Sequence, residues 1–65
     1  MKIVDRLMEL TDSPTVQSLA DKLEMERSRV SKYRNNEDVI QMKMLREWCD
    51  KLNIKFEIVF SEKKN

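Results

Sequence analysis

The chain has 65 residues and a formal net charge of +1, which results from 13 basic and 12 acidic side chains. It has one cysteine, no histidine and no glycine, which excludes a disulfide pair, the usual zinc spacings and a glycine-rich phosphate loop. A chain this short forms one small domain with a marginal core. We expect that domain to span residues 1–60 and a disordered tail to span residues 61–65.

The sequence also bears on location and on catalysis. No apolar run approaches a membrane span of about 18 residues, and charged residues interrupt the N-terminal stretch where a signal peptide would be apolar. We therefore expect a cytoplasmic protein that has no contact with a membrane. No nucleophile is paired with a base and no carboxylates converge at a recognisable spacing, so we expect neither an enzyme nor a metal or cofactor site.

The first half of the chain predicts two helices. Residues 1–11 repeat apolar side chains at helical spacing, which indicates a first helix. Pro14 restricts the residue before it to an extended backbone, so a new element begins near this point. Thr15 is a suitable N-cap for the second helix. The apolar stripe of that second helix consists of Val16, Leu19, Ala20 and Leu23.

A basic segment follows, over residues 27–36 (RSRVSKYRNN), and it contains no acid. On a helix, Val30 and Tyr33 share one side, which can pack on a core. The opposite side carries Ser28, Ser31, Lys32 and Asn35. Short polar groups and a lysine, flanked by arginines, suit a helix that lies in a DNA major groove. The alternative is a basic, solvated helix face that binds nothing.

The stretch LADKLEMERSRVSKYRNN resembles the helix-turn-helix of the Xre family, which includes the lambda-type repressors and the Cro proteins. In that motif a small residue lies where two helix backbones approach, and Ala20 occupies this place. Val30 would fill the facing gap. Glu24 stands at the turn position that usually holds glycine, so it must adopt a left-handed conformation or form a different turn.

The resemblance implies that the partner is double-stranded DNA. The residues expected to reach base edges are Arg27, Ser28 and Lys32. The residues expected to contact the DNA backbone are Gln17, Arg29, Ser31, Arg34 and Asn36. Glu26 would lie close to the DNA and repel phosphate unless it pairs with Arg27 or Arg29.

The end of the basic helix lacks glycine, so Asn36 is our candidate for a left-handed cap. Residues 37–41 are expected to form a loop. Asp38 would cap the next helix with Gln41 as its capping-box partner, whereas the resemblance places the start of that helix nearer Gln41.

The stretch MLREWCDKLN resembles the final helix of the family, with Asn53 where glycine normally closes it. Cys49 takes a position usually held by a small residue, so we interpret it as a buried thiol without a redox role. Apolar residues recur at helical spacing at Met42, Leu45, Trp48, Cys49 and Leu52.

The last stretch changes its period, because large apolar residues alternate with mainly polar ones and predict a β-strand. The alternating residues are Ile54, Phe56, Ile58 and Phe60. A single strand leaves its backbone unpaired, so we expect antiparallel pairing with the same strand of a second copy, which makes these residues a dimer interface. Some Xre-type proteins, including antitoxins of the HipB kind, are similar in ending with a dimerising strand. The alternatives are a strand that folds back on its own helices and a frayed tail.

The predicted fold is therefore mainly α, with four short helices that include a helix-turn-helix, plus one C-terminal β-strand paired across a homodimer. The predicted function is that of a transcriptional regulator, a homodimeric repressor that binds a pseudo-palindromic operator. One alternative is an antitoxin that also binds a toxin protein and regulates its own promoter. Another is a protein-binding module that no longer reads DNA, which Glu24 and Glu26 near the proposed surface would favour.

Overall fold

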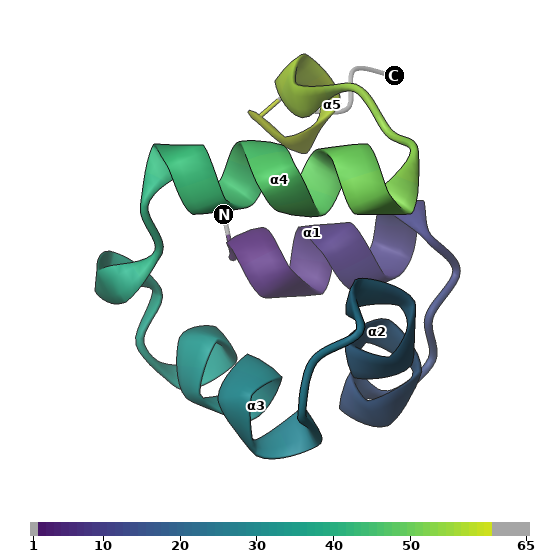
Figure 1. Ribbon diagram of the computed structural model, residues 1–65, viewed down its shortest axis with the longest axis vertical. Helices are drawn as coiled ribbons and strands as arrows, with labels where there is room; N and C mark the ends of the chain where they lie inside the picture. Colours follow the sequence, from purple (N-terminus) through teal and green to yellow (C-terminus); the bar gives the residue numbers. More distant parts are fainter. Residues whose placement is uncertain (1, 61–65) are drawn as a thin grey trace.

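The computed structural model describes residues 2–60, in which five α-helices and one 3-10 helix pack around a single core (Figure 1). The elements are α1 (Ile3–Leu10), α2 (Val16–Leu23), α3 (Arg27–Asn35), η1 (Glu37–Val39), α4 (Met42–Leu52) and α5 (Phe56–Phe60). The prediction of a mainly α fold is confirmed, and its four helices correspond to α1, α2, α3 and α4. The tail predicted over residues 61–65 lies outside the described residues.

The helices follow one another in layers along the longest axis of the molecule, and α1 and α4 run across that axis (Figure 1). Helix α1 runs through the middle, α2 and α3 form one end, and α5 lies over α4 at the other end. Within residues 2–60, no helix combines the length and the apolar character that crossing a membrane requires.

The core joins all five α-helices. Leu7, Leu19 and Leu45 are completely buried, and they bring together α1, α2 and α4. The rings of Tyr33 and Trp48 meet edge to face, with centroids 5.3 Å apart and planes at 62°, which joins α3 to α4. The complete set of buried apolar residues is Val4, Leu7, Leu19, Ala20, Leu23, Val30, Tyr33, Ile40, Leu45, Trp48, Cys49 and Val59.

The ends of α2 and α4 follow the local sequence. Thr15 caps α2 as predicted, because its Oγ accepts a hydrogen bond from the Ser18 N–H at 3.1 Å. Glu24 ends α2 in the left-handed conformation (φ 60°, ψ 42°), which is one of the two arrangements that the sequence left open. Asn53 ends α4 in almost the same conformation (φ 59°, ψ 43°), where the family pattern has glycine.

Two predictions about the segment between α3 and α4 are wrong. Asn36 is not a left-handed cap: its backbone lies at φ −140° and ψ 85°, because the chain continues directly into η1. Asp38 does not cap α4, because it lies inside η1, in a segment expected to be a loop. The N-cap of α4 is Gln41, without a side-chain hydrogen bond, as the alternative start near Gln41 implies.

The predicted C-terminal strand is also wrong, because Phe56–Phe60 forms helix α5 and residues 2–60 contain no strand. The physical reason lies in Val59. An alternating pattern places this residue on the outer face, but it is completely buried in the core. A helix can bury Val59 and leave Ile58 and Phe60 on its two flanks, whereas a strand cannot. The two-stranded ribbon expected from Ile54, Phe56, Ile58 and Phe60 is therefore not formed.

The start of α1 is capped by a residue from the opposite half of the chain. The Ile3 N–H donates to Glu37 Oε1 at 2.8 Å, and the Val4 N–H donates to Glu37 Oε2 at 3.0 Å. The first N–H groups of a helix have no acceptor within the helix, and a negative charge is favourable at this end. Lys2, the N-cap residue itself, provides no side-chain hydrogen bond, so Glu37 supplies the cap from η1.

This contact predicts that Glu37→Gln destabilises the fold. The amide would keep one acceptor for α1 and place an N–H₂ group against the other backbone donor, at a cost of about 1–2 kcal/mol. Urea unfolding followed by circular dichroism measures the change. The matched control is Glu47→Gln, since the exposed Glu47 side chain has no hydrogen bond or ion pair within residues 2–60. Equal unfolding midpoints for the two variants would contradict the role assigned to Glu37.

Candidate nucleic-acid interface

Helix α3 is packed on the core along one side and is open to solvent along the other. Val30 is 2 % exposed and Tyr33 is 9 % exposed, and these two residues hold the helix against its neighbours. The remaining residues of α3 are exposed, except for the partly buried Ser31. Helix α3 lies at the end of the molecule farthest from α5 (Figure 1), so no other described element covers its outer face.

Helix α2 and the turn after it determine where α3 begins. Ala20 is completely buried, as expected for the small residue at the approach of two helices. The left-handed Glu24 reverses the chain, and the Met25 N–H then donates to the Ala20 carbonyl at 2.9 Å. Residues 24–26 are thus a compact turn that starts α3 at Arg27. Glu26 is the N-cap residue and makes no side-chain capping bond, as expected from its poor capping tendency.

The structure brings together the predicted base-contacting residues Arg27, Ser28 and Lys32, because all are exposed on α3. Within residues 2–60, the side chains of Arg27, Arg29 and Lys32 form no hydrogen bond or ion pair. Helical spacing places Ser28 and Lys32 directly opposite the buried side, and Arg27 and Arg29 on its two flanks. The result is a short polar face with cations on both edges.

The residues predicted to contact the DNA backbone are less uniform. Arg29 and Asn36 are exposed, and Ser31 is partly buried. Gln17 is exposed on α2, where its Nε2 donates to Asp21 Oδ1 at 2.8 Å. Gln17 is therefore held along its own helix.

Arg34 differs from the other cations of α3 because it is paired. Its Nε donates to Asp5 Oδ1 at 2.8 Å, and both side chains are a little over two-fifths exposed. Asp5 was not predicted as a partner, and no local signal points to it because 29 positions separate the two residues. The bond uses only Nε, so the two Nη groups of the guanidinium keep donors for another acceptor.

Two acids lie next to the start of α3. Glu24 Oε1 lies 3.6 Å from Lys51 Nζ, so its charge is partly balanced from α4. Glu26 is exposed, and within residues 2–60 it pairs with neither Arg27 nor Arg29. The pairing that would neutralise Glu26 is therefore not formed in this structure, and its charge remains beside the basic face.

The exposed residue Asn35 also lies on the outer face of α3, on the side of Ser28. Helical spacing predicts Asn35 on the polar side, but no DNA contact was predicted for it. An amide side chain can donate to and accept from an adenine edge, so Asn35 belongs to the chemistry that this face offers.

The described residues contain no metal site, and the comparisons with known proteins identify no family. Within the described part of the chain, no group of three or more His, Cys, Asp or Glu side chains is placed to hold a metal ion. No protein-family model, no curated protein and no solved structure matches this chain.

The single thiol is buried, as the sequence predicts. Cys49 is 2 % exposed and lies on the side of α4 that faces the core. Burial raises the pKa of the Cys49 thiol above its ordinary value of 9.0, and the negative charge of the neighbouring Asp50 adds to this increase. A thiol with these properties is protonated and inaccessible at neutral pH, which is the opposite of a reactive cysteine.

The raised pKa of Cys49 predicts how stability depends on pH. The folded state keeps the proton longer than the unfolded state, so this group's contribution is complete below the ordinary pKa and is lost as pH rises through the folded pKa. The free energy of unfolding of the wild type should therefore fall more steeply above pH 9.0 than that of Cys49→Ala, which is the matched control. Parallel pH profiles from urea titrations would show that the thiol has no such effect.

Proposed function

We propose that this protein is a sequence-specific DNA-binding regulator that reads the major groove with α3. The outer face of α3 carries this proposal, because its polar and basic residues are exposed apart from the partly buried Ser31, unpaired within residues 2–60 apart from Arg34, and backed by a buried side that fixes the helix. The resemblance of residues 19–36 to the Xre helix-turn-helix supports the same function.

The chemistry of the face suggests a role for each side chain. Arg27 and Lys32 would donate to guanine O6 and N7, which are the major-groove acceptors that cations read best. Ser28 lies between them, and its hydroxyl can donate to or accept from the edges of several bases. Arg29, on the flank towards α4, would bind a phosphate and fix the register of the helix on the duplex.

The pairing of Arg34 with Asp5 fits a contact with the DNA backbone. The carboxylate holds Nε and therefore orients the guanidinium, whose Nη groups remain able to donate to a phosphate oxygen. The same acid reduces the local positive charge, as do Glu24 and Glu26 next to α3. Binding to DNA of arbitrary sequence would thus be weak, and affinity would depend on the contacts with bases.

The form of regulation that we propose is repression by a homodimer. One reading helix contacts only a few base pairs, so two copies related by a two-fold axis would be needed for a useful operator. Their α3 helices would enter major grooves one helical turn apart, about 34 Å, on a pseudo-palindrome. Occupation of a promoter by such a dimer is enough for repression and requires no further domain.

Selection of bound duplexes from a random DNA pool tests this function. We expect an enriched half-site that is repeated with opposite orientation, and its spacing would report the geometry of the dimer. Fluorescence anisotropy at matched salt then compares the selected duplex with a scrambled one. Equal affinity for the two duplexes, or no binding even at low salt, would exclude sequence-specific reading and leave the alternative of a protein-binding module.

Removal of a base contact should change specificity. Arg27→Ala should weaken binding to the selected site by about 1–3 kcal/mol and relax the preference at one base position of each half-site. The matched control is Lys55→Ala, which removes an exposed cation next to α5, at the other end of the molecule. Anisotropy titrations against single-base variants of the site measure both effects. If the two alanine variants behave alike, Arg27 does not contact a base.

Removal of a backbone contact should act differently. Arg34→Ala should weaken selected and scrambled duplexes by the same factor, and the slope of log affinity against log salt should decrease by about one phosphate contact. Asp5→Asn provides the comparison, because it removes a negative charge and keeps an oxygen that can accept from Nε, so affinity for both duplexes should rise. An unchanged salt slope in Arg34→Ala would mean that Arg34 serves only its ion pair with Asp5.

A further inference from the structure

We propose that a second copy of this chain docks on an apolar patch formed by Val39, Met42 and Phe60, with the part-buried Phe56 as its base. The three outer residues are 41 %, 50 % and 39 % exposed, and they come from η1, α4 and α5. This inference deepens the proposed function, since a reader of a two-fold operator requires a second copy. It replaces the strand ribbon, which the structure does not form.

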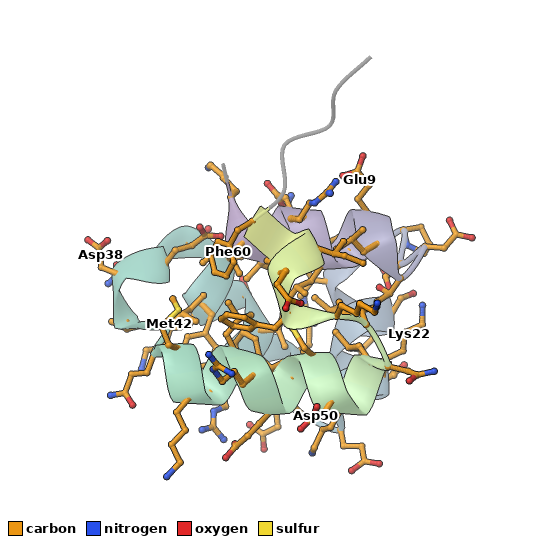
Figure 2. All side chains as sticks on the ribbon, turned by 90° about the horizontal axis from the view of Figure 1, so that it is seen from above. Glu9, Lys22, Asp38, Met42, Asp50 and Phe60 are labelled. Atoms are coloured by element: carbon orange, nitrogen blue, oxygen red, sulfur yellow. The ribbon has the colours of Figure 1, made fainter. Side chains whose placement is uncertain are left out.

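Two contacts join α4 to the aromatic part of the patch on α5. Arg46 lies one helical turn after Met42 on α4, and its guanidinium carbon lies 4.5 Å from the centroid of the Phe56 ring. The ring of Phe56 in turn meets the ring of Phe60 edge to face at 5.2 Å. Figure 2 shows Met42 and Phe60 in the same half of the molecule, the half that ends at Asp38.

Within residues 2–60, no element covers this patch, because its three outer residues remain exposed to solvent. Large apolar side chains that gather on the surface of a small protein mark a surface for association. Small domains with marginal cores also gain stability from a partner subunit.

The charges around the patch favour a second copy over an unrelated partner. Asp38 precedes Met42 and lies at the outer edge of the molecule (Figure 2), whereas Arg46 follows Met42 on α4 and its guanidinium lies over the Phe56 ring. Both side chains are exposed, and within residues 2–60 neither belongs to a salt bridge. In an isologous contact the same surface meets itself reversed, so a two-fold axis through Met42 would bring Asp38 towards Arg46 of the partner subunit.

This arrangement leaves α3 available. Phe60 belongs to α5, which lies at the opposite end of the longest axis from α3 (Figure 1), and no residue of α3 belongs to the patch. The dimer would therefore carry two outward reading helices.

Sedimentation velocity without DNA tests the patch on the complete chain, from about 1 to 100 µM. We expect the wild type to dimerise in this range and Met42→Glu to raise the dimer dissociation constant at least about tenfold, because it places a charge in an apolar contact. The matched control is Ile58→Glu, which adds the same charge to an exposed apolar residue on the opposite flank of α5. Its dissociation constant should stay within about threefold of the wild type.

The charge pair gives a second, independent measurement. Asp38→Lys and Arg46→Glu should each weaken the dimer, since each places like charges across the axis, and the double variant should restore most of the loss. Circular dichroism verifies that every variant keeps its helices. A wild type that stays monomeric at about 100 µM, an Ile58→Glu variant as weak as Met42→Glu, or a double variant no better than the single ones would each overturn the proposal.

The test separates this inference from the proposed function. Association is measured without DNA, so a dimer that binds no DNA would contradict the DNA-binding function and leave the docking surface in place. A monomer that still binds a single half-site would contradict the docking surface alone.

Discussion

The contact on which the candidate site depends is the packing of α3 on the core through Val30 and Tyr33. Val30 is buried in the core, and Tyr33 meets Trp48 of α4 edge to face at 5.3 Å. An aromatic pair of this kind is directional, so it fixes the rotation of α3 about its own axis. The direction of the outer polar side chains follows from that rotation. Without it, the same basic residues would form a helix with no defined face.

The chain makes its sharp turns without glycine, and this has an energetic cost. Asp12, Glu24 and Asn53 have positive φ values of 55°, 60° and 59°. For a residue with a side chain, this conformation costs about 1–2 kcal/mol, less for Asp and Asn, which bond locally to the backbone. Glu24 is the least suitable of these residues. It lies in the short turn between α2 and α3, where the chain must change direction sharply. The strain is tolerated because buried residues on both sides, Leu23 and Val30, determine the path of the chain.

The two proposals place different chemistry at the two ends of the molecule. One end carries exposed cations with short polar side chains, and it has little exposed apolar surface, so it suits a hydrated, charged partner such as DNA. The other end carries Met42 and Phe60 with an acid and a base at its edges, which suits a partner with the same composition. Since the net charge is only +1, this separation along the molecule, and not the total charge, distinguishes the two surfaces.

Much of the fold and of the site was predictable from local patterns. The apolar period of each of the first four helices, the cap at Thr15 and the closing residue Asn53 depend on neighbours in sequence, and the structure agrees with them. The exposed polar face of α3 was predictable for the same reason, because helical spacing alone separates Val30 and Tyr33 from Ser28 and Lys32.

Only the tertiary structure decided the features that depend on residues distant in sequence. A five-residue apolar segment fits a strand or a helix equally well, and the space in the core for Val59 selected α5 over the predicted strand. The two N–H groups at the start of α1 found their acceptor in Glu37, and the guanidinium of Arg34 found Asp5. Periodicity describes which side of an element is apolar. It carries no information about which distant charge meets that element, because that depends on how the helices pack in three dimensions.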